Sequence, residues 1–408
     1  MTPPAPAQTL GDIRALEGRH VVPTYRRQPV AFVRGEGVYL FDAEGRRYLD
    51  LLSGIGVASL GHAHPGLARA LAEQAATLVH TSNLYYHPLQ GQVAARLAAF
   101  SGLPRAFFCN SGTEAVEACL KFARRYWHAR GDTGRTGFVA LERGFSGRTM
   151  GALSVTWDDH YRAPFQPLVP GVTFVPPDDP AALAEAVGDA TAAIVVEPLQ
   201  GEGGVRPLDP AFAATLRDAC ARTGALLVAD EVQCGLGRTG VPFFFQALGL
   251  APDLVSVGKA LGGGVPVGAA LVSERVAGAI RAGDHGTTYG GNLLACRAAL
   301  CFLDELAGGL LDHVVRVGET LGSSVAALAA KHPGITAVRG RGLMWGLELD
   351  RDAAGVVDAA LARGLVVNRT AERVVRLLPP FVISEQEAAE GVALLDLALG
   401  DALGATPC

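Results

Sequence analysis

From about Pro104 onward, short apolar runs alternate with stretches of helical periodicity, and this alternation is the feature that most constrains the fold. The runs are too short for helices and apolar on both faces, which is typical of strands buried in a mostly parallel sheet covered by helices. They lie at residues 106–109, 137–141, 172–175, 192–196, 225–229 and 254–257. The sequence therefore predicts an α/β fold whose ligand site lies at the carboxyl ends of these strands.

The segments on either side of this alternation have a more mixed pattern. Runs at residues 37–41 and 47–52 flank a glycine-containing turn, which predicts a hairpin. After Gly291, a long helical segment interrupted near Gly308 reaches about Lys331, and short strands and a closing helix follow it.

The length of 408 residues favours two domains over one. We expect a large domain over residues 61–305. The N-terminal arm and hairpin, residues 1–60, are expected to join residues 306–408 in a smaller α+β domain.

Composition and charge exclude several classes of function. The net charge is −5 without a basic run, so there is no electrostatic case for nucleic acid or an acidic membrane. The seven cysteines form no C-x-x-C pair, which predicts reduced thiols and no structural zinc. The first residues lack the pattern of a signal peptide, and no segment is apolar enough to span a bilayer. We expect a cytoplasmic protein without a metal site.

Polar residues follow several of the predicted strands, and Lys259 is one of them. It stands between an apolar strand and a run of glycines, where an amine can be desolvated beside room for a flat ring. Desolvation lowers a lysine pKa and makes the amine nucleophilic, as Schiff-base chemistry requires. The alternative is a surface lysine beside a flexible loop.

Two further strand ends carry groups suited to a charged ligand. Ser111, Gly112 and Thr113 precede a helix and could bind phosphate at its N-terminus, although Ser111 and Glu114 also have the spacing of an ordinary capping box. Asp230 follows a buried strand and could pair with a protonated pyridine nitrogen, or it could simply cap a loop.

Arg148 and Arg376 lie among apolar or small residues, where a guanidinium needs a carboxylate partner from the protein or from a substrate. Each could equally form a structural ion pair. Glu202 stands on a flexible turn that follows a strand, and Thr287 and Thr288 add hydroxyls in a glycine-rich loop.

Two local patterns point elsewhere. Gly235-Leu-Gly-Arg-Thr-Gly matches a nucleotide-binding fingerprint, but no clean helix follows it and no acidic residue stands at the required distance. His62 and His64 suggest a metal site, but no partner cluster supports one, and a role in the loop before Pro65 is favoured.

Taken together, the motifs resemble one family, the class III aminotransferases, which are pyridoxal-phosphate enzymes of fold type I. The motifs, in family order, are Asn110-Ser-Gly-Thr-Glu-Ala, Glu197-Pro-Leu-Gln-Gly-Glu-Gly-Gly, Asp230-Glu-Val-Gln, Gly258-Lys-Ala-Leu-Gly-Gly-Gly, Gly286-Thr-Thr-Tyr-Gly-Gly-Asn and Arg376-Leu-Leu-Pro-Pro. The resemblance implies a large domain with a mostly parallel seven-stranded sheet, a smaller α+β domain and pyridoxal 5′-phosphate as cofactor.

Within the class, Ser82-Asn-Leu-Tyr-Tyr and Gly144-Phe-Ser-Gly-Arg-Thr-Met are most similar to the acetylornithine aminotransferases. They are closest to the branch that also serves lysine synthesis on an acidic amino-group carrier protein, LysW. Many acetylornithine enzymes have histidine where this chain has Ser146.

The resemblance also implies roles for individual residues. Lys259 would bind the cofactor covalently and move a proton as general base and acid, and Asp230 would pair with the ring nitrogen. The other cofactor-binding residues would be Ser111, Gly112, Thr113, Phe145, Gln233 and, from the neighbouring subunit, Thr288. The last of these makes a homodimer the expected active unit.

Substrate binding would divide between two places. Arg376 would bind the α-carboxylate of glutamate, and Glu202 would neutralise Arg376 when an ω-amine substrate binds. Arg148 and Thr287 would hold the free carboxylate of an N2-acylated diamino acid.

The resulting hypothesis is a transaminase that moves the ω-amino group between N2-acylated ornithine or lysine and 2-oxoglutarate, in arginine or lysine biosynthesis. The alternatives are a 4-aminobutyrate or ornithine aminotransferase, a glutamate-1-semialdehyde aminomutase, and a non-catalytic nucleotide-binding protein that uses residues 235–240.

Overall fold

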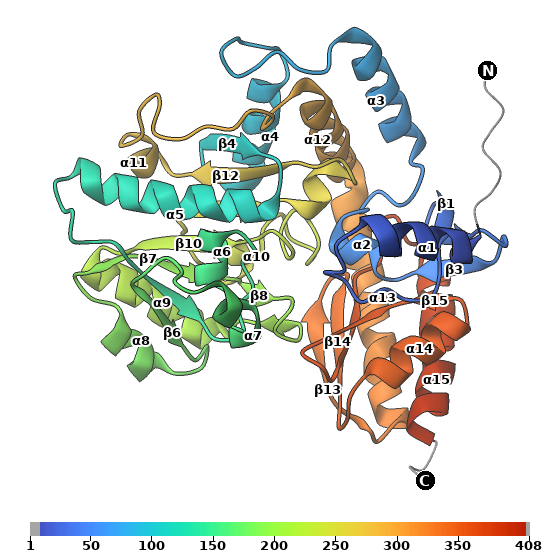
Figure 1. The fold of residues 1–408 in the computed structure, drawn as a ribbon. Coiled ribbons are helices and arrows are strands. Elements are labelled where there is room, and N and C mark those ends of the chain that lie inside the picture. The colour runs from blue at the N-terminus through green and yellow to red at the C-terminus, as the bar shows by residue number, and fades with distance from the viewer. Residues whose placement is uncertain (1–8, 405–408) are drawn as a thin grey trace.

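A seven-stranded sheet forms the centre of the molecule in a computed structural model that describes residues 9–404 (Figure 1). Only the strand next to one edge, β12, runs antiparallel to its neighbours. The strands lie in the order β4 (Arg105–Cys109), β12 (Gly268–Val272), β11 (Leu254–Val257), β10 (Leu226–Asp230), β7 (Thr191–Val196), β5 (Gly137–Leu141) and β6 (Val172–Val175). The predicted α/β fold with a mostly parallel sheet is confirmed.

Both faces of this sheet are buried, as the uninterrupted apolar runs predict. Along β10, Leu226 and Val228 belong to a cluster with helix α5 (Gly112–Ala129), whereas Leu227 and Ala229 belong to the main core on the opposite face. This alternation follows from the two-residue period of a strand. In Figure 1, α5 lies along one side of the sheet.

The sequence located six of the seven strands and missed β12. Its residues Gly268, Ala269 and Ala270 have low strand propensity, so nothing local marks them as a strand. A Cβ atom on Gly268 would lie 2.3 Å from the backbone oxygen of Ser111, so only glycine fits where β12 passes the end of β4.

A second unit combines the two ends of the chain. One sheet has the order β13 (Ile335–Arg341), β14 (Met344–Leu349), β17 (Val374–Leu377) and β16 (Asn368–Thr370). Another joins the N-terminal strands β1 (Phe32–Glu36), β2 (Tyr39–Asp42) and β3 (Arg47–Asp50) to β15 (Leu365–Val366). Strands β2 and β3 form the predicted hairpin, and β3 pairs in parallel with β15. Figure 1 shows the N-terminal elements beside the C-terminal ones.

The remaining helices cover these sheets or connect them. Helix α12 (Leu293–Glu305) continues through a π-helical turn (Leu306–Leu310) into α13 (Leu311–Lys331), which confirms the interruption predicted near Gly308. The other helices are α1 (Leu10–His20), α2 (Ser53–Gly56), α3 (Pro65–Thr77), α4 (Gln90–Ser101), α6 (Met150–Ser154), α7 (Asp159–Arg162), α8 (Pro180–Ala186), α9 (Pro210–Thr223), α10 (Phe244–Ala247), α11 (Glu274–Ala277), α14 (Ala354–Ala362) and α15 (Glu385–Gly404). Short elements are η1 (Ala163–Phe165), η2 (Lys259–Gly262), β8 (Leu199–Gln200) and β9 (Arg206–Pro207).

Within residues 9–404, no helix is long and apolar enough to cross a membrane, and no group of histidine, cysteine and acidic side chains could hold a metal ion. The six cysteines in this range are free thiols. The terminal residues 1–8, on which the signal-peptide prediction depends, and Cys408 lie outside the described residues.

Candidate active site

The carboxyl ends of β4, β10 and β11 meet through closely packed backbone. A Cβ atom on Gly112, at the start of α5, would lie 2.5 Å from Cγ1 of Val232, two residues beyond the end of β10. A Cβ atom on Gly258, just after β11, would lie 3.1 Å from Cα of Gly112. Glycine at both positions therefore brings Lys259, Asp230 and the N-terminus of α5 to one place.

The N-terminus of α5 presents backbone donors that are suited to an anion. Ser111 caps the helix, and its hydroxyl accepts the N–H of Glu114 at 3.3 Å. The N–H groups of Gly112 and Thr113 have no acceptor among residues 9–404, so they remain free for a ligand at the positive end of the helix dipole. The capping and the anion-binding interpretations of this motif are therefore compatible. The hydroxyl of Thr113 is hydrogen-bonded to that of Thr149 at 2.9 Å.

Asp230 is the last residue of β10 and is almost fully buried. Its Oδ1 accepts hydrogen bonds from the hydroxyl of Ser256 at 3.0 Å and from the N–H of Val232 at 3.2 Å. Burial raises the pKa of Asp230 to about 6, and its hydrogen bonds and the nearby Lys259 oppose that rise. A buried carboxylate of this kind can hold a proton on a ring nitrogen.

Lys259 begins the short helix η2 and has a backbone φ of 41°. This left-handed conformation is rare for a residue with a side chain, and strain of this kind is common at functional sites. Burial lowers the pKa of the Lys259 amine, which favours the nucleophilic form, while Glu202 acts in the opposite direction. Lys259 is half-buried, which argues against the alternative of a surface lysine beside a flexible loop.

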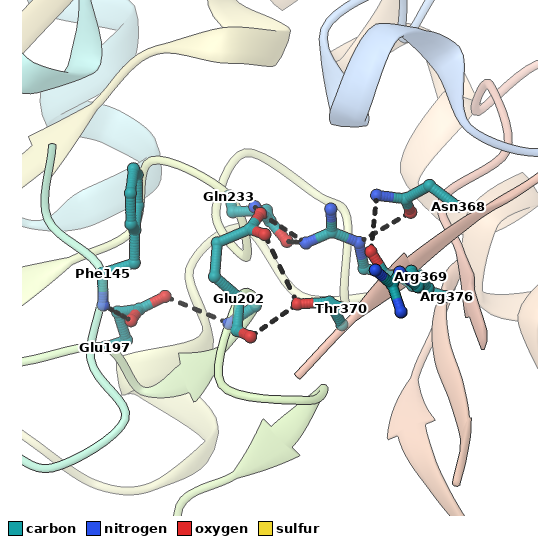
Figure 2. A network of polar contacts seen from close by, with 9 residues as sticks. Phe145, Glu197, Glu202, Gln233, Asn368, Arg369, Thr370 and Arg376 are labelled. Atoms are coloured by element: carbon teal, nitrogen blue, oxygen red, sulfur yellow. Dashed lines mark hydrogen bonds and ion pairs between the residues drawn. The ribbon is translucent and has the colours of Figure 1, made fainter. Parts of the chain in front are cut away.

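Phe145 lies on the loop after β5, and a hydrogen bond from its backbone N–H fixes its position. Its N–H donates to Oε1 of Glu197 at 2.8 Å, and the N–H of Gly201 donates to Oε2 of the same carboxylate at 3.1 Å (Figure 2). Burial, reinforced by Asp230, raises the pKa of Glu197 to about 8. One buried carboxyl group thus fixes both the Phe145 loop and the turn that carries Glu202.

Arg376, on β17, is fully buried and forms the centre of a polar cluster (Figure 2). Its Nη1 donates to Oε1 of Glu202 at 2.6 Å and to Oε1 of Gln233 at 3.1 Å. Its Nη2 is buried and has no hydrogen-bond partner in the described chain. A buried donor without a partner is costly, which indicates room for an acceptor from a ligand.

Two residues of this cluster were not predicted from the sequence. Asn368 accepts the Nε–H of Arg376 at 3.2 Å, and the hydroxyl of Thr370 donates to the backbone oxygen of Glu202 at 2.5 Å. Both lie on β16, which the sequence did not mark as a strand. The one sequence signal that could have identified Asn368 and Thr370 is their spacing of two residues next to a predicted strand, which places both side chains on the same face.

The remaining predicted residues lie on exposed loops. The Arg148 guanidinium stacks on Tyr161 at 3.6 Å, and within residues 9–404 it forms no ion pair with a carboxylate, so its N–H groups are available to a ligand. The Thr287 hydroxyl accepts from Nδ2 of Asn110 at 3.2 Å, beside the end of β4, and Thr288 is exposed. Among the described residues, no hydrogen bond joins Thr287 to Arg148.

The two patterns set aside in the sequence have structural roles. In the glycine-rich loop at residues 235–240, Arg238 is buried and donates from Nη1 to the backbone oxygens of Leu343 and Pro379. This loop therefore connects the large sheet to the second unit, which contains the C-terminal strands. His62 pairs with Asp50 at 2.8 Å, and His64 caps α3 through its ring nitrogen.

These residues fit a flat, phosphorylated, cationic cofactor that reacts with an amine. The free N–H groups at α5 suit a phosphate, Asp230 suits a ring nitrogen, and the desolvated amine of Lys259 suits a covalent bond to a carbonyl carbon.

Comparison with known proteins identifies the class. The family Aminotransferase class-III matches residues 21–399, and this chain belongs to it. The family is pyridoxal-phosphate-dependent, so the predicted cofactor is confirmed.

Similar proteins are known by sequence and by structure. The chain is 43% identical to the acetylornithine aminotransferase of Methanocaldococcus jannaschii, over 93% of this chain and 96% of that protein. It is 46% identical to acetylornithine aminotransferase 1 of Bordetella bronchiseptica, over 91% and 95%. A solved structure of the ornithine aminotransferase of Toxoplasma gondii, with pyridoxal phosphate at partial occupancy in its active site, has a TM-score of 0.92 at 32% identity. The match covers 97% of this chain and 95% of the Toxoplasma gondii chain.

Proposed function

We propose that this class III aminotransferase moves the ω-amino group between an N2-acylated ornithine or lysine and 2-oxoglutarate. The observation that carries this proposal is the buried pair of Arg376 and Glu202, with Nη2 of Arg376 unpartnered. A true transaminase needs such an arginine to bind glutamate, and it needs the carboxylate partner when the second substrate brings an uncharged chain to the same place.

Each of the residues proposed to bind the cofactor would have a separate role. When bound, pyridoxal phosphate supplies an electron sink for the bond that breaks beside the substrate amine. Lys259 holds the cofactor and moves the proton at the reacting carbon, since its amine is desolvated. Asp230 would keep the ring nitrogen protonated, and Gln233 and Phe145 would contact the ring hydroxyl and the ring face.

The phosphate is bound by Ser111, Gly112 and Thr113 at the start of α5. Thr288 of the partner subunit completes this phosphate site. Thr288 is exposed and forms no hydrogen bond with residues 9–404 of its own chain, which supports this assignment.

The acyl end of the substrate is held by Arg148 and by Thr287. Arg148 already stacks on Tyr161, which fixes its guanidinium while leaving its N–H groups free to bind a carboxylate. The names of the relatives favour the acetyl group, and the Gly144-Phe-Ser-Gly-Arg-Thr-Met motif favours a carrier-linked lysine as a further substrate. A single methylene is worth only about 1–3 kcal/mol of discrimination, so one pocket can serve both chain lengths.

The active unit is a homodimer in the cytoplasm. Exposed apolar side chains gather on the loop at residues 84–86 and on the neighbouring loop at Tyr289, and a second copy of the chain would cover them. Within each subunit, residues 61–305 form the large domain, and residues 1–60 with 306–408 form the smaller one. The pairing of β3 with β15 supports this division.

A side-by-side rate comparison with N2-acetylornithine and carrier-linked lysine, each with 2-oxoglutarate, tests the proposal. We expect turnover with N2-acetylornithine that depends on 2-oxoglutarate and is abolished by Lys259→Ala, together with the loss of the lysine adduct that borohydride traps. Turnover without an external amino acceptor would instead favour an aminomutase. A preference for free ornithine or 4-aminobutyrate would reassign the substrate.

A further inference from the structure

Strand β16 holds both members of the Glu202–Arg376 pair. It is the edge strand beside β17, and successive side chains point to opposite sides. Arg369 points away from the pair and forms an ion pair with Asp352, whereas Asn368 and Thr370 point toward the pair (Figure 2). The spacing of two residues therefore places two polar side chains over the same cluster.

The two side chains act on different members of the pair. Asn368 accepts from Nε of Arg376 at 3.2 Å and so fixes the arginine. The Thr370 hydroxyl donates to the backbone oxygen of Glu202 at 2.5 Å and lies 3.4 Å from its Oε2. Thr370 is 6% exposed, so water competes little for these contacts.

The backbone of the turn that carries Glu202 is held on both sides of this residue, for example by Arg339, which donates to the carbonyl of Gly204 at 3.1 Å, but the Glu202 residue itself has fewer contacts. The carboxylate of Glu197 holds the N–H of Gly201 at one end, and Glu202 itself is held by Thr370, Gln233 and Arg376. Of these three, Arg376 and Gln233 belong to the proposed ligand site, and Thr370 does not. Thr370 is thus the contact that keeps Glu202 in place when Arg376 is drawn toward another carboxylate.

We propose that Thr370 is a positioning residue that holds Glu202 against Arg376 and thereby sets the balance between the two substrate classes. The inference rests on the proposed function, because it concerns substrates that compete for Arg376. With the Thr370 contact intact, the pair stays closed and an uncharged chain fits beside it. Without that contact, Glu202 leaves Arg376 more readily, and a carboxylate substrate binds better.

The test compares Thr370→Val, which removes the hydroxyl at nearly constant volume, with Thr370→Ser, which keeps it. Isothermal calorimetry on the holoenzyme measures the affinity for glutarate, an unreactive dicarboxylate that probes Arg376. The KM values for glutamate and for N2-acetylornithine are measured separately. One hydrogen bond is worth about 0.5–1.5 kcal/mol, so Thr370→Val is expected to tighten glutarate binding about two- to twelvefold. It should also lower the KM for glutamate and raise that for N2-acetylornithine.

Two further variants make the outcome decisive. Asn368→Leu removes the support of Arg376 instead, so glutarate should bind more weakly, the opposite sign from Thr370→Val. Thr370→Ser should match the wild type. Equal changes for both substrates in Thr370→Val, no change at all, or a serine variant that behaves like valine would overturn the inference.

Arg376→Lys separates this inference from the function it rests on. If Arg376→Lys leaves glutarate affinity unchanged, the proposed carboxylate site itself is wrong. If Arg376→Lys weakens glutarate binding and Thr370→Val has no effect, only the role of Thr370 fails. Melting temperatures and the cofactor absorbance of each variant identify any that misfold, and Thr370→Ala then replaces Thr370→Val.

Discussion

Glu231 follows Asp230 directly but faces the protein core instead of the ligand site. It is 1% exposed, and its Oε1 accepts the N–H of Phe245 at 2.7 Å. Burial raises the pKa of Glu231 from 4.5 to about 7. The folded protein therefore binds a proton that the unfolded chain releases, and this contribution to stability is lost as the pH rises from about 4.5 through 7.

We expect Glu231→Gln to remove this pH dependence. Relative to the wild type, its unfolding free energy should rise by about 2–3 kcal/mol between pH 5 and pH 8 and change little above that. Urea unfolding at several pH values measures the difference, and the exposed Glu44→Gln provides the matched control. Parallel pH curves for wild type and Glu231→Gln would contradict the prediction.

Gly112 is a residue at which a single methyl group should disturb the cofactor site. Its Cβ would lie 2.5 Å from Val232, and the displacement would move the start of α5 away from Gly258. Overpacking of this kind costs about 1–3 kcal/mol, so Gly112→Ala should weaken pyridoxal-phosphate binding about tenfold or more.

A spectroscopic titration of the cofactor-free protein with pyridoxal phosphate measures this affinity. Gly91→Ala is the control, because a methyl group there, in helix α4, meets nothing within 4 Å. An unchanged affinity in Gly112→Ala would show that α5 does not hold the phosphate.

At the scale of elements, the strands that could be predicted from the sequence are those that are uniformly apolar. The strands at residues 192–196 and 254–257 could be recognised because burial on both faces requires apolar side chains at nearly every position. The strand β12 starts with Gly-Ala-Ala, and β16 is Asn-Arg-Thr, so neither has the composition of a strand. Their conformation comes from pairing with neighbours that are distant in sequence.

The residues of the candidate site also divide into those that could be predicted from the sequence and those that could not. Lys259, Asp230 and the start of α5 could be identified because motifs with known chemistry follow apolar strands. Asn368 and Thr370 could not, because their contacts with Arg376 and Glu202 exist only once β16 has paired with β17. Local patterns identify groups that touch a ligand more readily than groups that hold those residues in place.

The glycine-rich loop at residues 235–240 yields a prediction at the same scale. Arg238 donates to the carbonyls of Leu343 and Pro379 and stacks on Phe381 at 4.3 Å. Arg238→Met would leave both carbonyls buried without a donor, so we expect a loss of about 3 kcal/mol in unfolding free energy. Arg217→Met is the control, since Arg217 donates to the carbonyl of Gly249 at the surface. Equal melting temperatures for the two variants would contradict a connecting role.

At the scale of the whole molecule, the exposed apolar patch at Leu84, Tyr86 and Tyr289 is where the proposed second subunit would pack. The Tyr86 side chain is fully exposed in the single chain, and Leu84 is 85% exposed. We expect Leu84→Asp combined with Tyr86→Asp to give monomers, because buried carboxylates without partners oppose association. Sedimentation velocity measures the change, and Leu397→Asp, on helix α15, should leave the oligomer intact.

This prediction links assembly to activity. If Thr288 of the partner subunit completes the phosphate site, the monomeric variant should also bind pyridoxal phosphate more weakly than the wild type. A wild-type protein that sediments as a monomer, or a monomeric variant with full cofactor affinity, would contradict the proposed dimer.

The parallel pairing of β3 with β15 has a consequence for how the chain folds during synthesis. All strands of the large sheet lie between Arg105 and Val272, so that sheet can assemble before the ribosome has finished the chain. The hairpin of β2 and β3 emerges first but must wait for β15, which emerges near the end. The smaller unit is therefore the last to close, and Arg376 reaches Glu202 only at that point. A ribosome-bound chain that ends before β15 would contain Lys259 and Glu202 but not Arg376, so the candidate site would be incomplete.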